Sequence, residues 1–146
     1  MVAEIVNIPE WRVKNFAEGP AYGLPPSQTL GMGRGSRRLY DLSGILRVAI
    51  ANELVNSGFM PEVVGGAIAK VQEADVLKIH AEIQVSGSST NNHVLIRLRC
   101  KWDVRKVHQA TNLTRKALEQ GGEGRGIFAL NLSSLVARVL KRLKDR

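Results

Sequence analysis

The feature that most constrains the fold is a stretch rich in glycine and proline near the N-terminus. Residues 19–36 contain five glycines and three prolines. Proline removes a backbone N–H and glycine costs about 1 kcal/mol in a helix interior, so this stretch cannot form a regular helix. We expect residues 20–36 to form a long loop or a β-ribbon, closed by a short strand at 37–40.

Helical signals stand on the N-terminal side of this stretch. Residues 2–6 predict a short helix, and Pro9 suits the first turn of a second helix that ends near residue 18. Apolar residues on this second helix, which we expect to face the core, are Trp11, Val13 and Phe16.

Two more helices are predicted on the C-terminal side. Asp41 is a favourable N-cap, and apolar residues between positions 42 and 54 recur at the spacing of one buried helical stripe. Gly58 ends this helix, and Pro61 begins the next. Arg47 is expected on a solvated face.

A change of pattern near residues 72–76 indicates a different structure in the second half. Apolar and polar residues alternate over 76–85 and again over 93–103, which predicts a β-hairpin with a turn at 86–92. Helix 104–119, strand 127–130 and helix 132–144 follow. Cys100 alternates with Leu98 and Trp102 and is therefore predicted to be a buried thiol. The fold class expected is α+β, with a small ββαβα domain at 74–146.

Composition excludes several classes of protein. The 146 residues are 44% apolar and suffice for one ordinary domain or two very small ones. There is no apolar run of 18 residues and no signal-peptide pattern, one cysteine cannot build a disulfide framework, and the three histidines lack metal-binding spacing. We also find no acid–base pair. We therefore expect a cytoplasmic protein that is not an enzyme and uses no metal or cofactor.

The charge distribution predicts an anionic partner, with nucleic acid as the first candidate. The net charge is +8, and all of this surplus lies in residues 74–146. Locally, residues 12–38 carry five basic side chains against Glu18 alone. Residues 97–116 carry seven against Asp103. This second cluster is open to three interpretations: a solvated face, a second nucleic-acid contact, or a pocket for an anionic small-molecule effector.

The order of motifs in the first half resembles the winged helix-turn-helix domain of the MerR family of bacterial transcription regulators. Five segments carry the resemblance over residues 2–71. They are the turn residue Ile8, the basic and aromatic run Arg12-Val13-Lys14-Asn15-Phe16, the segment Tyr22-Gly23-Leu24-Pro25-Pro26, the closing Arg37-Arg38-Leu39-Tyr40 with Asp41, and Leu54 with Gly58-Phe59.

This resemblance implies a DNA-binding transcription regulator with its winged helix-turn-helix at residues 1–73. Helix 9–18 would enter the major groove, and the wing at 20–40 would follow the adjacent backbone. The domain at 74–146 would serve dimerisation or ligand sensing in a homodimer. An alternative is a phage or mobile-element accessory protein for DNA packaging or recombination, and Tyr40 has an alternative interpretation as a core residue. The residues expected to bind double-stranded DNA are Arg12, Lys14, Asn15, Arg34, Arg37, Arg38 and Tyr40.

Overall fold

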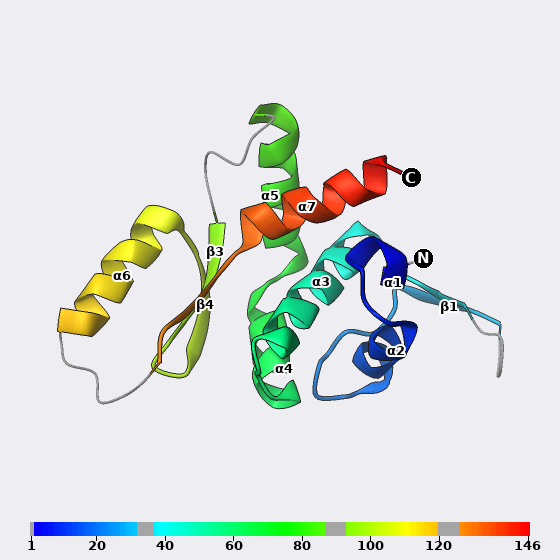
Figure 1. Cartoon of the computed structure of the whole chain (residues 1–146), viewed down its shortest axis with the longest axis horizontal. Coiled ribbons are helices and arrows are strands. Elements are labelled where there is room, and N and C mark those ends of the chain that lie inside the picture. Colours follow the sequence, from blue (N-terminus) through cyan, green and yellow to red (C-terminus); the bar gives the residue numbers. More distant parts are fainter. Residues whose placement is uncertain (1, 32–36, 87–92, 120–125) are drawn as a thin grey trace. The chain divides into compact units, whose positions relative to one another are not determined.

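The protein has an α+β fold, seen in a computed structural model that describes residues 2–31, 37–86, 93–119 and 126–146 (Figure 1). The chain divides into two compact units. The first contains the chain up to Ala69 together with Val139–Arg146, and the second is Lys70–Arg138. The sequence-based division at residues 73 and 74 is close to the first junction. It places residues 139–146 in the second domain, however, whereas they pack with the first unit.

Two short helices begin the first unit, as predicted. Helix α1 (Val2–Val6) ends where Asn7 takes a left-handed conformation with φ of 61°. The Asn7 and Ile8 amides donate to the carbonyls of Glu4 and Ala3 at 3.2 and 2.8 Å. This pattern is a Schellman motif, which turns the chain sharply. Helix α2 (Glu10–Glu18) follows at once, with Pro9 as its N-cap.

The glycine- and proline-rich stretch includes an antiparallel β-ribbon. Strand β1 (Gln28–Leu30) pairs with β2 (Arg37–Leu39). Before the ribbon, the chain packs closely on helix α4 (Pro61–Lys70), because a Cβ atom at Gly65 would lie 1.8 Å from the Ala21 carbonyl oxygen. Leu24 anchors the same segment and is only 3% exposed. We predicted either a long loop or a β-ribbon for this stretch, and the paired strands confirm the ribbon.

Helix α3 (Leu42–Asn56) is the central helix of the first unit. Its predicted cap is confirmed, since the Asp41 carboxylate accepts a hydrogen bond from the Gly44 amide at 2.7 Å. Gly58, with φ of 90°, ends the helix in a second Schellman motif. Apolar side chains are buried on more than one face of α3, because Leu46 and Val48 are both buried and lie about 160° apart around the helix, whereas a single stripe was predicted. Arg47 is half-buried and donates to the Ile68 carbonyl, so the prediction of a solvated position is wrong.

The predicted strand at 76–85 is wrong, because these residues lie in helix α5 (Glu73–Ser86). Val76 and Ile79 are buried at helical spacing, whereas Leu77 and Val85 are exposed. The Asp75 carboxylate accepts a hydrogen bond from the Gln72 amide at 3.0 Å, which is half of a capping box and stabilises the start of a helix. The predicted turn at 86–92 lies almost wholly outside the described residues.

The hairpin is instead formed within the segment that we predicted as one strand. Strand β3 (His93–Leu98) turns through Arg99 and Cys100 into β4 (Lys101–Lys106). Both turn residues have positive φ, 49° and 64°, which is the geometry of a type I′ turn. Cys100 is consequently exposed at the turn, and the prediction of a buried thiol is wrong. Trp102 is buried as predicted.

The second unit is completed by elements close to their predicted positions. Strand β5 (Phe128–Asn131) pairs with the other side of β3, so the sheet order is β4-β3-β5. Helix α6 (Val107–Glu119) packs on this sheet through Ala110, which lies against Val94 and Ile96. The observed order of elements after residue 72 is αββαβα rather than ββαβα.

The last helix, α7 (Leu132–Lys144), has the predicted bounds. The Asn131 side chain caps it by accepting a hydrogen bond from the Ser134 amide at 2.9 Å. The apolar residues of α7 recur at helical spacing and form one stripe. Most of this stripe is buried within the single chain, and it therefore offers no large free surface for a partner. The buried stripe residues are Leu132, Leu135, Val136, Val139 and Leu140.

Candidate functional site

The basic side chains of α2 and of the ribbon come together in the first unit. Lys14 and Asn15 are exposed on α2. Arg38 on β2 forms an ion pair with Glu18, the last residue of α2. This pair ties the ribbon to the end of α2. Of the other predicted site residues on the ribbon, Arg37 stands in β2 opposite Leu30, and Arg34 lies outside the described residues.

Arg12 differs from the exposed residues of α2, because its guanidinium faces helix α3. Its Nη1 donates to the amide oxygens of Asn52 at 2.8 Å and Asn56 at 2.9 Å. Asn52 is itself buried, so these bonds satisfy an amide that has little access to water. In the structure, Arg12 thus holds α2 against α3, a role that the sequence did not suggest.

Trp11 is 58% exposed, and the prediction that it faces the core is wrong. An α-helix turns by about 100° per residue, which places Val13 and Phe16 about 60° apart and Trp11 about 140° or more from either. Val13 and Phe16 are buried as predicted. The Arg12 guanidinium lies 5.2 Å from the centre of the indole ring, within the range of a cation–π contact.

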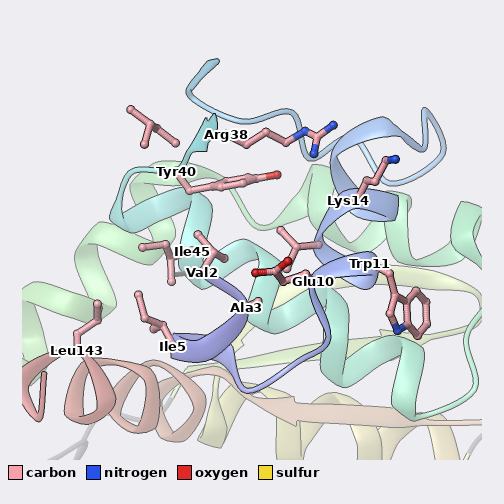
Figure 2. A pocket seen from close by; sticks show the side chains of 12 residues that line it. Val2, Ala3, Ile5, Glu10, Trp11, Lys14, Arg38, Tyr40, Ile45 and Leu143 are labelled. Carbon is pink, nitrogen blue, oxygen red and sulfur yellow. The ribbon is translucent and has the colours of Figure 1, made fainter. Parts of the chain in front are cut away.

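A cavity of about 820 Å³ opens beside these residues in the first unit (Figure 2). Its walls come from α1, α2, the end of the ribbon, α3 and the last turn of α7. The apolar part includes Val2, Ile5, Ile45 and Leu143. The polar part consists of Glu10, Lys14, Arg38 and Tyr40. Most of the lining is therefore apolar, and we call the four polar residues, Glu10, Lys14, Arg38 and Tyr40, the rim of the cavity.

Tyr40 carries the least satisfied polar atom of this cavity. Figure 2 shows its ring reaching toward α2, with Arg38 above it and Glu10 below it. Its hydroxyl is shielded from solvent and finds no hydrogen-bond partner among the described residues. Burial raises the pKa of Tyr40, and the nearby charge of Arg38 opposes this shift. The phenol therefore keeps its proton at neutral pH and is available as a hydrogen-bond donor.

The end of the chain braces the short helix α1. Arg142 on α7 donates to the carbonyls of Ile5 and Val6 at 3.4 and 3.2 Å. These carbonyls belong to the last turn of α1, where no intrahelical donor is available. Arg146 pairs with Glu4 at 2.6 Å, and this hydrogen bond lowers the pKa of Glu4.

The basic cluster at 97–116 is partly engaged within the second unit. Arg105 pairs with Asp103 at 2.8 Å, and the Arg97 guanidinium lies 5.5 Å from the centre of the Trp102 ring. The sheet nearby also holds the buried His93, whose Nδ1 is 3.4 Å from the Glu82 carboxylate. These contacts favour a structural role for part of the cluster.

Comparisons with known proteins add no family assignment. No protein-family model matches the sequence, and no curated protein matches it significantly. Within the described ranges, no helix has the length and apolar character needed to cross a membrane, and no cluster of His, Cys, Asp or Glu could hold a metal ion.

Proposed function

We propose that this chain is a sequence-specific DNA-binding transcription regulator with a winged helix-turn-helix in its first unit. Helix α2 would be the recognition helix, and the β1–β2 ribbon would be the wing. The observation that carries the proposal is the ion pair between Arg38 and Glu18. Through this pair, the exposed face of α2 and the ribbon belong to one surface, as binding to a groove and its neighbouring backbone requires.

The residues exposed on α2 have suitable chemistry for the major groove. Lys14 can donate to guanine O6 and N7 or to a phosphate, and Asn15 can form two hydrogen bonds with adenine. The left-handed Asn7 produces the sharp turn between α1 and α2. The resemblance of residues 2–71 to the MerR family supports the same assignment.

Arg12 and Arg38 have indirect roles in this proposal. Arg12 orients α2 through its bonds to Asn52 and Asn56. Arg38 is paired in the free protein, so a DNA phosphate would compete with Glu18 for its guanidinium. Tyr40 would offer its unpaired hydroxyl to the same phosphate, which would satisfy a buried donor.

We further propose that the regulator acts as a homodimer in the cytoplasm, with the second domain serving dimerisation or ligand sensing. A single half-site rarely gives a helix-turn-helix protein enough affinity, and two-fold symmetry doubles the contacts. The expected target is a short inverted repeat.

The test is selection of bound DNA from a random library, followed by footprinting on the selected sequence. A protected inverted repeat is the expected result. Binding without sequence preference would contradict the proposal, and protection confined to sites near DNA ends would favour the packaging or recombination alternative.

A salt titration then tests the wing. Replacing Arg37 and Arg38 together by alanine should reduce the slope of log affinity against log salt by about 0.9 for each lost phosphate contact. The control is Lys70→Ala, which removes an exposed lysine at the end of α4. A slope that stays the same in the double variant would exclude the ribbon as a phosphate contact.

A further inference from the structure

The cavity beside α2 has the size and composition of a small-molecule site. Ligand pockets generally measure about 300–1,000 Å³ and combine apolar walls with a few polar groups. This cavity, at about 820 Å³, has that range and that composition. All of its walls belong to the first unit.

The polar groups of the rim determine which ligand charge the cavity favours. Lys14 contributes one positive charge and Glu10 one negative charge, whereas the positive charge of Arg38 is paired with Glu18, with which a ligand anion would compete. The protonated Tyr40 hydroxyl adds a donor that has no acceptor among the described residues. A buried donor gains most from an acceptor, and an anionic acceptor forms the stronger hydrogen bond.

We propose that this cavity binds a small molecule with an apolar body and one anionic group, such as a carboxylate. The apolar body would lie against Ile5, Ile45 and Leu143. The anionic group would lie at the rim, between Lys14, Arg38 and the Tyr40 hydroxyl.

The position of the site implies that the ligand and DNA compete, an implication that rests on the proposed function. Lys14, Arg38 and Tyr40 are the groups that we assign to DNA, and they cannot serve a ligand anion and a phosphate at once. Thermodynamic linkage then requires that each partner weaken the binding of the other by the same factor. The ligand would thereby displace DNA directly, because it would occupy the same side chains that contact the operator.

Calorimetric titration without DNA tests the binding step. The probes are octanoate, octylammonium and octanol, which share one alkyl chain and differ in the charge of the head group. We expect octanoate to bind most tightly. The variants Lys14→Gln and Tyr40→Phe should each weaken octanoate roughly two- to five-fold, as expected for one exposed charge or one hydrogen bond. Lys70→Gln, with the same change of charge away from the cavity, should have no effect.

Several results would overturn the proposal. Equal affinity for octanoate and octylammonium would remove the anionic preference, and equal losses in Lys14→Gln and Lys70→Gln would show that binding occurs elsewhere. No heat of binding with octanoate at millimolar concentrations would exclude the site altogether.

The competition is measured separately, on the selected DNA. Saturating octanoate should weaken DNA binding by the unmodified chain, and undiminished affinity would refute the shared site. If the chain binds no DNA at all, the proposed function fails, while the calorimetric titration still decides whether the cavity binds an anion.

Discussion

The two adjacent glycines of α4 provide a matched test of the packing that holds the ribbon. Gly65 faces the Ala21 carbonyl, and a Cβ atom there would lie 1.8 Å from the oxygen, where real Cβ contacts are not found below 3.0 Å. Gly66, the next residue, is exposed. Alanine raises helix propensity by about 1 kcal/mol at either position, so the two substitutions differ in their packing alone.

We expect the two variants to change stability in opposite directions. Gly66→Ala should gain about 1 kcal/mol and raise Tm by roughly 2–4 °C. Gly65→Ala gains the same propensity but forces the backbone near residue 21 to move, at a cost near the upper end of roughly 1–3 kcal/mol for overpacking. The net result is a loss of roughly 1–2 kcal/mol and a decrease in Tm of roughly 2–8 °C.

The assay is thermal unfolding followed by far-ultraviolet circular dichroism, with urea titration at 25 °C as a second measurement. DNA affinity provides an independent readout, because the segment that packs on Gly65 leads directly into β1. If Gly65→Ala stabilises the protein as much as Gly66→Ala does, the segment before the ribbon does not pack on α4, and our account of what positions the ribbon is refuted.

Three further predictions concern single side chains, each checked by urea unfolding. Arg12→Ala should cost roughly 1–3 kcal/mol because it removes two hydrogen bonds to α3, whereas Lys14→Ala should stay within about 0.5 kcal/mol; equal effects would contradict the assigned roles. Arg142→Ala should cost about 1 kcal/mol by leaving the α1 carbonyls without their donor, with the exposed Lys141→Ala as control; no difference between them would exclude the brace. Tyr40→Phe should stabilise the protein by about 1 kcal/mol, since it removes an unpaired buried hydroxyl, and a loss of stability would mean that the hydroxyl has a partner.

The elements that sequence patterns predicted correctly are those whose ends are fixed by local chemistry. The boundaries of α2, α3 and α4 follow from four residues that affect only their close neighbours in the chain: Pro9, Asp41, Gly58 and Pro61. The α+β class, the ribbon and the bounds of α7 were also predictable.

Periodicity gave a wrong prediction where the same apolar pattern fits both a strand and a helix. In α5, alternating apolar residues include a helical subset, and Val76 and Ile79 of this subset are buried. The bond from the Gln72 amide to Asp75 also stabilises the start of the helix. The turn at Arg99 and Cys100 has neither glycine nor asparagine, so no local signal marked it.

In the candidate site too, features that depend on neighbouring residues could be predicted, and features that depend on distant residues could not. Lys14, Asn15 and Arg38 were predicted from motifs within short segments of the sequence, and the structure places Lys14 and Asn15 on the exposed face of α2. The bonds from Arg12 to α3 connect residues 40 and 44 positions apart, and the cavity brings together residues near both ends of the chain, in α1 and α7, for which one sequence carries no signal. The indole of Trp11 could have been placed correctly from helical geometry alone.

The bonds from Arg142 to α1 have a consequence for the order in which the chain folds. The first unit needs residues from both ends of the sequence, and the whole second unit is inserted between them. During synthesis, α1 leaves the ribosome long before Arg142 does, because the residues that the bonds connect are 136 and 137 positions apart. A nascent chain therefore contains the whole second unit before it contains the residues that complete the first unit. Until α7 has been synthesised, α1 lacks the Arg142 side chain that donates to its last carbonyls, and the first unit lacks residues 139–146.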